Sequence, residues 1–138
     1  MLIRFAAVLA CLGGSALADY RLTLTDIGKR DYYCTITVML TNDSDAPLTE
    51  INAFFLNFVG DTEVGRSKGA SFFDVPAGGS STATFETPNA PCSANDTEVE
   101  SYKMIIGACR IGTGFEDKSV CVSRMELAAP FSEASALN

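Results

Sequence analysis

The sequence contains no histidine, and this absence excludes much of enzyme chemistry. Histidine is the commonest general base, the usual activator of a serine or cysteine nucleophile, and a frequent transition-metal ligand. A hydrolase would then depend on two carboxylates facing each other in a cleft. The candidate pairs, Asp61 with Glu63 and Glu116 with Asp117, lie beside glycines in segments that we predict to be turns. We therefore expect a protein that is not an enzyme, without catalytic residues, metal ligands or a bound cofactor.

Hydrophobic runs long enough to cross a membrane are missing as well. A spanning helix needs about 20 apolar residues, whereas the N-terminal apolar stretch runs only from Phe5 to Leu12. It follows Arg4 and precedes Ala16-Leu17-Ala18, and together these parts are typical of a secretory signal peptide. We predict cleavage after Ala18, and hence a periplasmic or secreted protein. Cys11 leaves a lipoprotein signal as the alternative, although the residues before it match the lipid-attachment pattern poorly.

Basic residues are the minority among the charges. Removal of residues 1–18 leaves 138 − 18 = 120 residues, the size of one domain. The removed segment holds one arginine and no acid, so the remaining charge is 9 − 17 = −8. Such a chain repels phosphates and anionic headgroups instead of releasing their counterions. We expect no nucleic-acid partner and no membrane span, but a protein partner with a basic patch, such as an envelope complex to which the protein binds peripherally.

Cysteine is sparse but even in number once the signal is removed. The remaining residues are Cys34, Cys92, Cys109 and Cys121, and none of them forms a CxxC pair. In an oxidising compartment this pattern favours structural disulfides over a metal site.

Alternating apolar and polar residues recur along the chain, and long helical patterns do not. In the segment from Cys34 to Thr41, for example, Ile36, Val38 and Leu40 alternate with threonines and methionine. Such patterns predict strands at residues 20–24, 34–41, 51–59, 71–75, 80–86, 99–111 and 119–127. About seven short strands separated by turns are typical of an immunoglobulin-like antiparallel β-sandwich. We assign this domain to residues 19–127 and expect residues 128–138 to form a loose C-terminal tail.

The predicted strand directions suggest how the cysteines pair. If successive strands alternate in direction, Cys34 and Cys92 lie at one end of the sandwich, and Cys109 and Cys121 at the other. We therefore predict the disulfides Cys34–Cys92 and Cys109–Cys121. The alternation places Ile105, Cys109 and Ile111 on one face of their strand, and Cys121, Met125 and Leu127 on one face of the last strand.

Adjacent aromatic residues mark the candidate binding surface. Phe54-Phe55 and Phe72-Phe73 lie in predicted strands, and the adjacent pair Tyr32-Tyr33 directly precedes one. Neighbouring side chains of a strand point to opposite faces, so one member of each pair points away from the core. Either loops or the C-terminal tail cover these rings, or the rings form a contact surface for a partner. On the second interpretation the partner-binding candidates are Phe54, Phe55, Phe72 and Phe73.

The acidic segment Asn42-Asp43-Ser44-Asp45 resembles a calcium-binding loop only in its first residues. Pro47 and Ala53 stand where such a loop needs glycine and glutamate. Turn formation explains the segment, and a cation site shared with another loop is the alternative.

The region from Thr35 to Glu86 carries a resemblance to a known family. An alternating strand ends in Asn42, Pro47-Leu48 leads into the aromatic strand Phe54 to Phe58, and a Pro-Ala-Gly-Gly-Ser turn precedes Phe85. This pattern resembles the FxLYD-like, immunoglobulin-like extracytoplasmic domains of bacteria. The resemblance implies a fold and transfers no functional residue, and the chain has neither the Phe-x-Leu-Tyr-Asp string nor a counterpart there for its cysteines.

Together these patterns predict a non-catalytic, exported protein-interaction module, an accessory subunit of a periplasmic or envelope complex. The first alternative is a periplasmic protein that binds a small ligand or a cation through its acidic loops. The second is a secreted enzyme inhibitor that presents residues 87–92 or 112–118 as a rigid loop.

Overall fold

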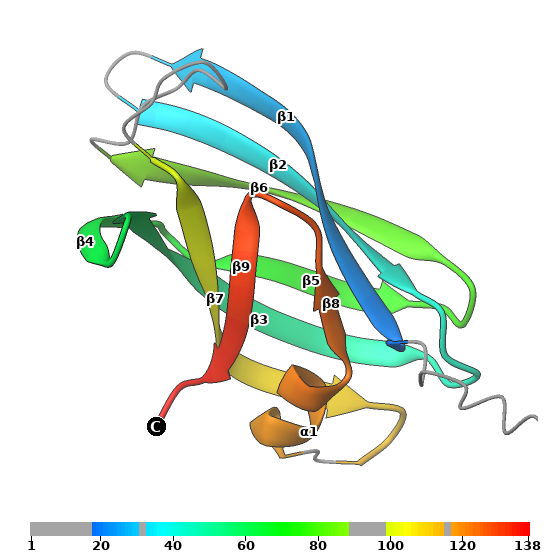
Figure 1. Ribbon diagram of the computed structural model, residues 1–138. Coiled ribbons are helices and arrows are strands. Elements are labelled where there is room, and N and C mark those ends of the chain that lie inside the picture. Colours follow the sequence, from blue (N-terminus) through cyan, green and yellow to red (C-terminus); the bar gives the residue numbers. More distant parts are fainter. Residues whose placement is uncertain (1–17, 31–32, 89–98, 115–116) are drawn as a thin grey trace, which may run out of the picture.

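Two β-sheets face each other across a hydrophobic core in the computed structural model, which describes residues 18–30, 33–88, 99–114 and 117–138 (Figure 1). Sheet A has the strand order β6-β2-β1-β8, and sheet B has the order β4-β3-β7-β9, with β5 also paired to β3. The all-β sandwich is thereby confirmed. The elements are β1 (Tyr20–Arg30), β2 (Tyr33–Asn42), β3 (Leu48–Val59), β4 (Thr62–Arg66), β5 (Ala70–Val75), β6 (Ser80–Pro88), β7 (Ser101–Ile111), α1 (Lys118–Ser123), β8 (Met125–Leu127) and β9 (Phe131–Ala136).

The alternating sequence of β2 places its side chains as predicted. Ile36, Val38 and Leu40 are fully buried between the sheets, and the intervening side chains lie on the outer face of sheet A. At the centre of the core the ring of Phe55 stacks on Phe85 with centroids 4.5 Å apart and contacts Phe131 at 5.3 Å. Burial of such rings is the largest apolar contribution that a core of this kind gains.

The segment 119–127 is not the single strand that the sequence predicted. Residues 118–123 form α1, and only Met125–Leu127 form a strand, β8, which pairs in parallel with β1. The carboxylate of Asp117 accepts a hydrogen bond from the backbone N–H of Ser119 and caps the helix, and hydrogen bonding to Ser119 lowers the pKa of Asp117. The cap starts a helix where alternation alone suggested a strand.

The predicted C-terminal tail is also wrong, because residues 131–136 form β9. This strand pairs in parallel with β7, and Phe131 is buried against Phe55 and Tyr102. Between β8 and β9 the chain crosses from sheet A to sheet B through Pro130, whose peptide bond is cis. The pairing with β7 and the buried ring of Phe131 together fix a segment that has little hydrophobic pattern of its own.

The disulfide Cys109–Cys121 is present and joins β7 to α1. The predicted faces of β7 need correction, however. Cys109 points into the core while Ile105 is on the outer face, because the register of β7 against β3 shifts between Ile106 and Ala108. The predicted bridge Cys34–Cys92 includes a residue outside the described ranges and stays a prediction.

Candidate functional site

The outer face of sheet B carries an apolar row that the sandwich does not bury. β3 lies between β7 on one side and β4 and β5 on the other, so its inward side chains are in the core. Its outward side chains and one from β7 are only half-buried. We call these four residues the outer row: Phe54, Leu56, Phe58 and Ile105. Phe54 and Ile105 are direct cross-strand neighbours, which makes the row continuous.

Cationic side chains lie against the aromatic rings of the outer row. The guanidinium carbon of Arg66 is 5.3 Å from the ring centroid of Phe54, and Nζ of Lys103 is 4.6 Å from that of Phe58. Both distances are in the range of cation–π attraction. The same cations form ion pairs, Arg66 with Glu63 at 3.7 Å and Lys103 with Glu133 at 2.9 Å. The row is therefore bordered by charges of both signs.

The structure distinguishes the members of each predicted phenylalanine pair. Phe55 and Phe72 are fully buried and belong to the core. Phe54 is half-buried on the outer face, and Phe73 is 57% exposed. Phe73 lies opposite Glu50, which forms a 3.1 Å ion pair with Arg110 of β7. Of the four predicted contact residues, only Phe54 and Phe73 are therefore available to a partner.

Other residues of this face were not singled out by the sequence. The alternation along β3 already placed Leu56 and Phe58 beside Phe54, and that was a usable signal. Ile105 was assigned to the wrong face because the register shift in β7 reverses the alternation. The bordering charges come from three other strands, β4, β7 and β9, and no local pattern links them.

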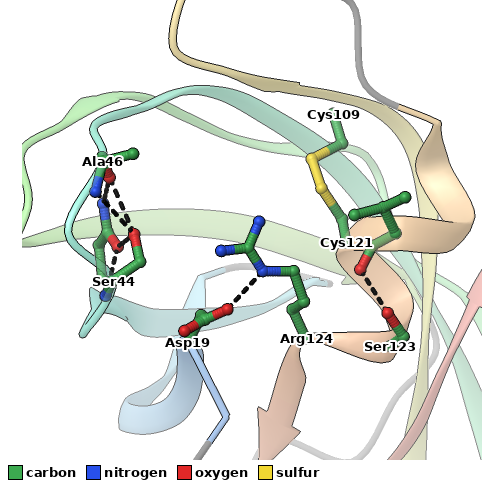
Figure 2. Close-up of polar contacts among 9 residues, drawn as sticks. Asp19, Ser44, Ala46, Cys109, Cys121, Ser123 and Arg124 are labelled. Carbon is green, nitrogen blue, oxygen red and sulfur yellow. Dashed lines mark hydrogen bonds and ion pairs between the residues drawn. A yellow bond between two sulfur atoms is a disulfide. The ribbon is translucent and has the colours of Figure 1, made fainter.

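The acidic loop after β2 is engaged in its own turn (Figure 2). The side-chain amide of Asn42 donates to the carbonyls of Ala46 and Val75 and accepts from the N–H of Ser44. Asp43 forms a 2.6 Å ion pair with Arg21, and this hydrogen bond raises the pKa of Arg21. Across the described ranges, no group of three or more Asp, Glu, Cys or His residues is placed to hold a metal ion.

Beside this loop, Arg124 connects two parts of the chain that lie far apart in sequence. Figure 2 shows its side chain between the loop that carries Ser44 and the Cys109–Cys121 disulfide. Its Nε forms an ion pair with Asp19, and its guanidinium lies 5.3 Å from the ring of Tyr20. These contacts fix the start of β1 to the end of α1, which is a structural role.

The other surfaces carry fewer features that could bind a partner. Thr37 and Thr84 are hydrogen-bonded across the outer face of sheet A, which is mostly polar. The loops predicted for an inhibitor, 87–92 and 112–118, lie partly outside the described residues. In the described part of the chain no helix has the length and apolar character needed to cross a bilayer.

No protein-family model and no curated protein matches the chain.

Proposed function

We propose that this protein is a non-catalytic, exported interaction module, an accessory subunit of a periplasmic or envelope complex, and that it docks through the outer face of sheet B. The observation that carries the proposal is the outer row, together with the exposed ring of Phe73 on the same face. Aromatic side chains surrounded by charged residues are the usual composition of an interface centre and its rim.

The backbone under the outer row supports this role. β3 is hydrogen-bonded on both sides, so the row is held in one arrangement before a partner arrives. A preformed surface loses less conformational entropy on binding than a mobile loop does. The disulfide between β7 and α1 further restrains the sheet.

We also propose that the sandwich is immunoglobulin-like. In that fold the first, second and fifth strands share one sheet, and the third, sixth and seventh share the other. Here β1, β2 and β6 lie together in sheet A, and β3, β7 and β9 lie together in sheet B, with β4 and β5 at its edge. The parallel pairing of β9 with β7 departs from the antiparallel arrangement. The resemblance of residues 35–86 to FxLYD-like domains agrees with the same proposal.

Affinity capture with matched variants tests the docking face. The tagged protein is exported in its native host, cross-linked mildly and recovered from the envelope fraction. The double variant Phe54→Ser/Phe73→Ser should lose the captured partner, because it removes the apolar contacts on the outer face of sheet B. The control Met39→Ser removes a half-buried apolar side chain from the outer face of sheet A and should keep the partner.

Melting curves accompany the capture. The double variant should melt within a few degrees of the wild type, as expected for changes away from the core. Phe55→Ser should instead unfold the protein, since its ring is buried between Phe85 and Phe131. Recovery of the wild-type protein only as a monomer without a cross-linked partner, or unchanged capture by the double variant, contradicts docking through this face.

A further inference from the structure

We propose that the occupant of the outer face of sheet B is a second copy of the chain, packed face to face about a two-fold axis that runs parallel to the strands between β3 and β7. This inference rests on the proposed function, because it names the partner of the same face. The argument comes from the order of side chains across the sheet.

The strand register gives that order directly. At the level of Leu56, the neighbour on β4 is Arg66 and the neighbour on β7 is Lys103. Lys103 in turn pairs with Glu133 on β9. From one edge of the sheet to the other, the sequence of groups is therefore positive, apolar, positive, negative. Toward the start of β3, Phe54 lies beside Ile105, and still nearer the start Glu50 lies beside Arg110.

A two-fold axis between β3 and β7 reverses this order in the facing copy. β4 then lies over β9, and β3 lies over β7, at unchanged levels along the strands. Arg66 of one copy faces Glu133 of the other, and Glu50 faces Arg110, so opposite charges meet at both positions. Phe54 faces Ile105, and Leu56 lies over the aliphatic stem of Lys103. The face is thus complementary to itself, as a two-fold interface requires.

The exposed apolar side chains fit the same arrangement. Phe73 on β5 and Leu137 after β9 are 57% and 44% exposed, and they lie towards opposite edges of sheet B. The two-fold operation places each of them over the edge of the sheet that carries the other, with Phe73 at the level of Glu50 and Leu137 just after the level of Ala53. Association through this face therefore covers apolar surface at both edges that the separate copies leave in water.

The charge distribution also favours a second copy over a strongly basic partner. The ion-paired side chains on the outer face of sheet B are three acidic and three basic, whereas the whole chain has a formal charge of −7. A basic partner would be attracted to the acidic remainder of the surface more than to this face. The balanced charges are Glu50, Glu63 and Glu133 against Arg66, Lys103 and Arg110.

The dimer should be weak, because the apolar side chains on this face are limited to the half-buried outer row and to the exposed Phe73 and Leu137. The test measures molar mass by light scattering after size exclusion, and self-association by sedimentation, between about 10 µM and 1 mM. The wild-type protein should shift from monomer to dimer over this range.

Charge reversal tests the arrangement itself. Arg66→Glu alone and Glu133→Arg alone should each weaken self-association by about tenfold or more, because like charges then face each other. An equimolar mixture of the two variants should associate again, since each contact then joins opposite charges. The control Arg21→Glu reverses a charge on sheet A and should leave self-association unchanged.

Each outcome separates this inference from the proposed function. A wild-type protein that stays monomeric to about 1 mM overturns the second copy; docking itself stands if that monomer still captures a partner that Phe54→Ser/Phe73→Ser loses. Dimers that the charge reversals do not weaken, or that the mixture does not restore, overturn the arrangement. A monomer that also captures nothing overturns both.

Discussion

Two asparagine side chains are buried in the core, and they differ in whether their amides are hydrogen-bonded. Asn42 is fully buried, and its amide is hydrogen-bonded to the turn after β2 and to β5. Asn57 on β3 is 1% exposed, and neither its Nδ2 nor its Oδ1 finds a hydrogen-bond partner within the described part of the chain. It sits opposite Tyr102, whose pKa is raised by burial of the phenol. The amide of Asn57 therefore loses its hydration on folding without compensation.

Replacing Asn57 with leucine should stabilise the protein. The change removes an unsatisfied polar group at nearly constant volume, so the free energy of unfolding should rise by about 1–3 kcal/mol. Asn42→Leu, which breaks satisfied buried bonds, should lower it by at least a similar amount. Urea unfolding monitored by circular dichroism compares the two variants. A less stable Asn57→Leu protein would mean that the amide has a partner, such as a buried water.

At the residue scale, alternation predicted much of the burial. The inward side of β2, with Ile36, Val38 and Leu40, was read directly from the sequence. Ile105 was misplaced because the register shift in β7 depends on how β3 pairs with it, and this information lies far away in the chain. The phenylalanine pairs were predicted to split between two faces, but which member is buried depends on which side the other sheet covers.

At the scale of elements, α1 depends on its surroundings. It is only six residues long, and a helix of this length is not stable by itself in water. Its cap at Asp117, the burial of Cys121 and the Cys109–Cys121 bond hold it against β7. Lys118 adds a hydrogen bond to the backbone carbonyl of Leu137 after β9.

Removing the disulfide should first destabilise α1 and its packing against β7. Closing a loop of sequence separation 12 is worth about 3 kcal/mol in the loop-entropy description, so Cys109→Ala/Cys121→Ala should lower the free energy of unfolding by about that amount. Hydrogen exchange should accelerate more at residues 118–123 than in β2, because the helix then opens separately. Equal acceleration in both elements would show that the bond stabilises the fold only globally.

Element types were predictable only where a strand carried its own pattern. The segment 119–127 contains alternating apolar residues, yet the cap at Asp117 and the bond from Cys121 produce a helix. β4 went unpredicted because its side chains are largely exposed, and β9 because its small side chains show no alternation. Both strands exist because a neighbouring strand offers hydrogen bonds, which is a property of the assembled sheet.

At the scale of the whole molecule, charge is unevenly distributed. The chain carries 17 acidic and 10 basic residues, while the ion-paired side chains on the outer face of sheet B are three acidic and three basic. Two copies that approach through this face therefore repel each other through their remaining surfaces. The contacts at the face are short-ranged, and the repulsion acts over longer distances.

Salt should consequently strengthen self-association. The Debye length falls from about 30 Å at 0.01 M to about 8 Å at 0.15 M ionic strength, so the repulsion between copies with the same net negative charge is screened before the contact pairs are. Sedimentation equilibrium at these two concentrations should give the smaller dissociation constant at the higher salt. Weaker association at 0.15 M would mean that attraction at the contact pairs outweighs the repulsion between the remaining surfaces, and it would contradict this prediction.

The C-terminal crossover has a consequence for the order of folding. β8 is the edge strand of sheet A beside β1, and β9 is the edge strand of sheet B beside β7. Residues 125–136 therefore add one edge strand to each sheet. A chain that emerges N-terminus first from a translocation channel can form the β1–β2 and β3–β7 pairs early. It cannot add these two edge strands until residues 125–136 have appeared. If the protein is exported as proposed, the crossover that joins the two sheets thus leaves one edge of each sheet unpaired until this segment has left the channel.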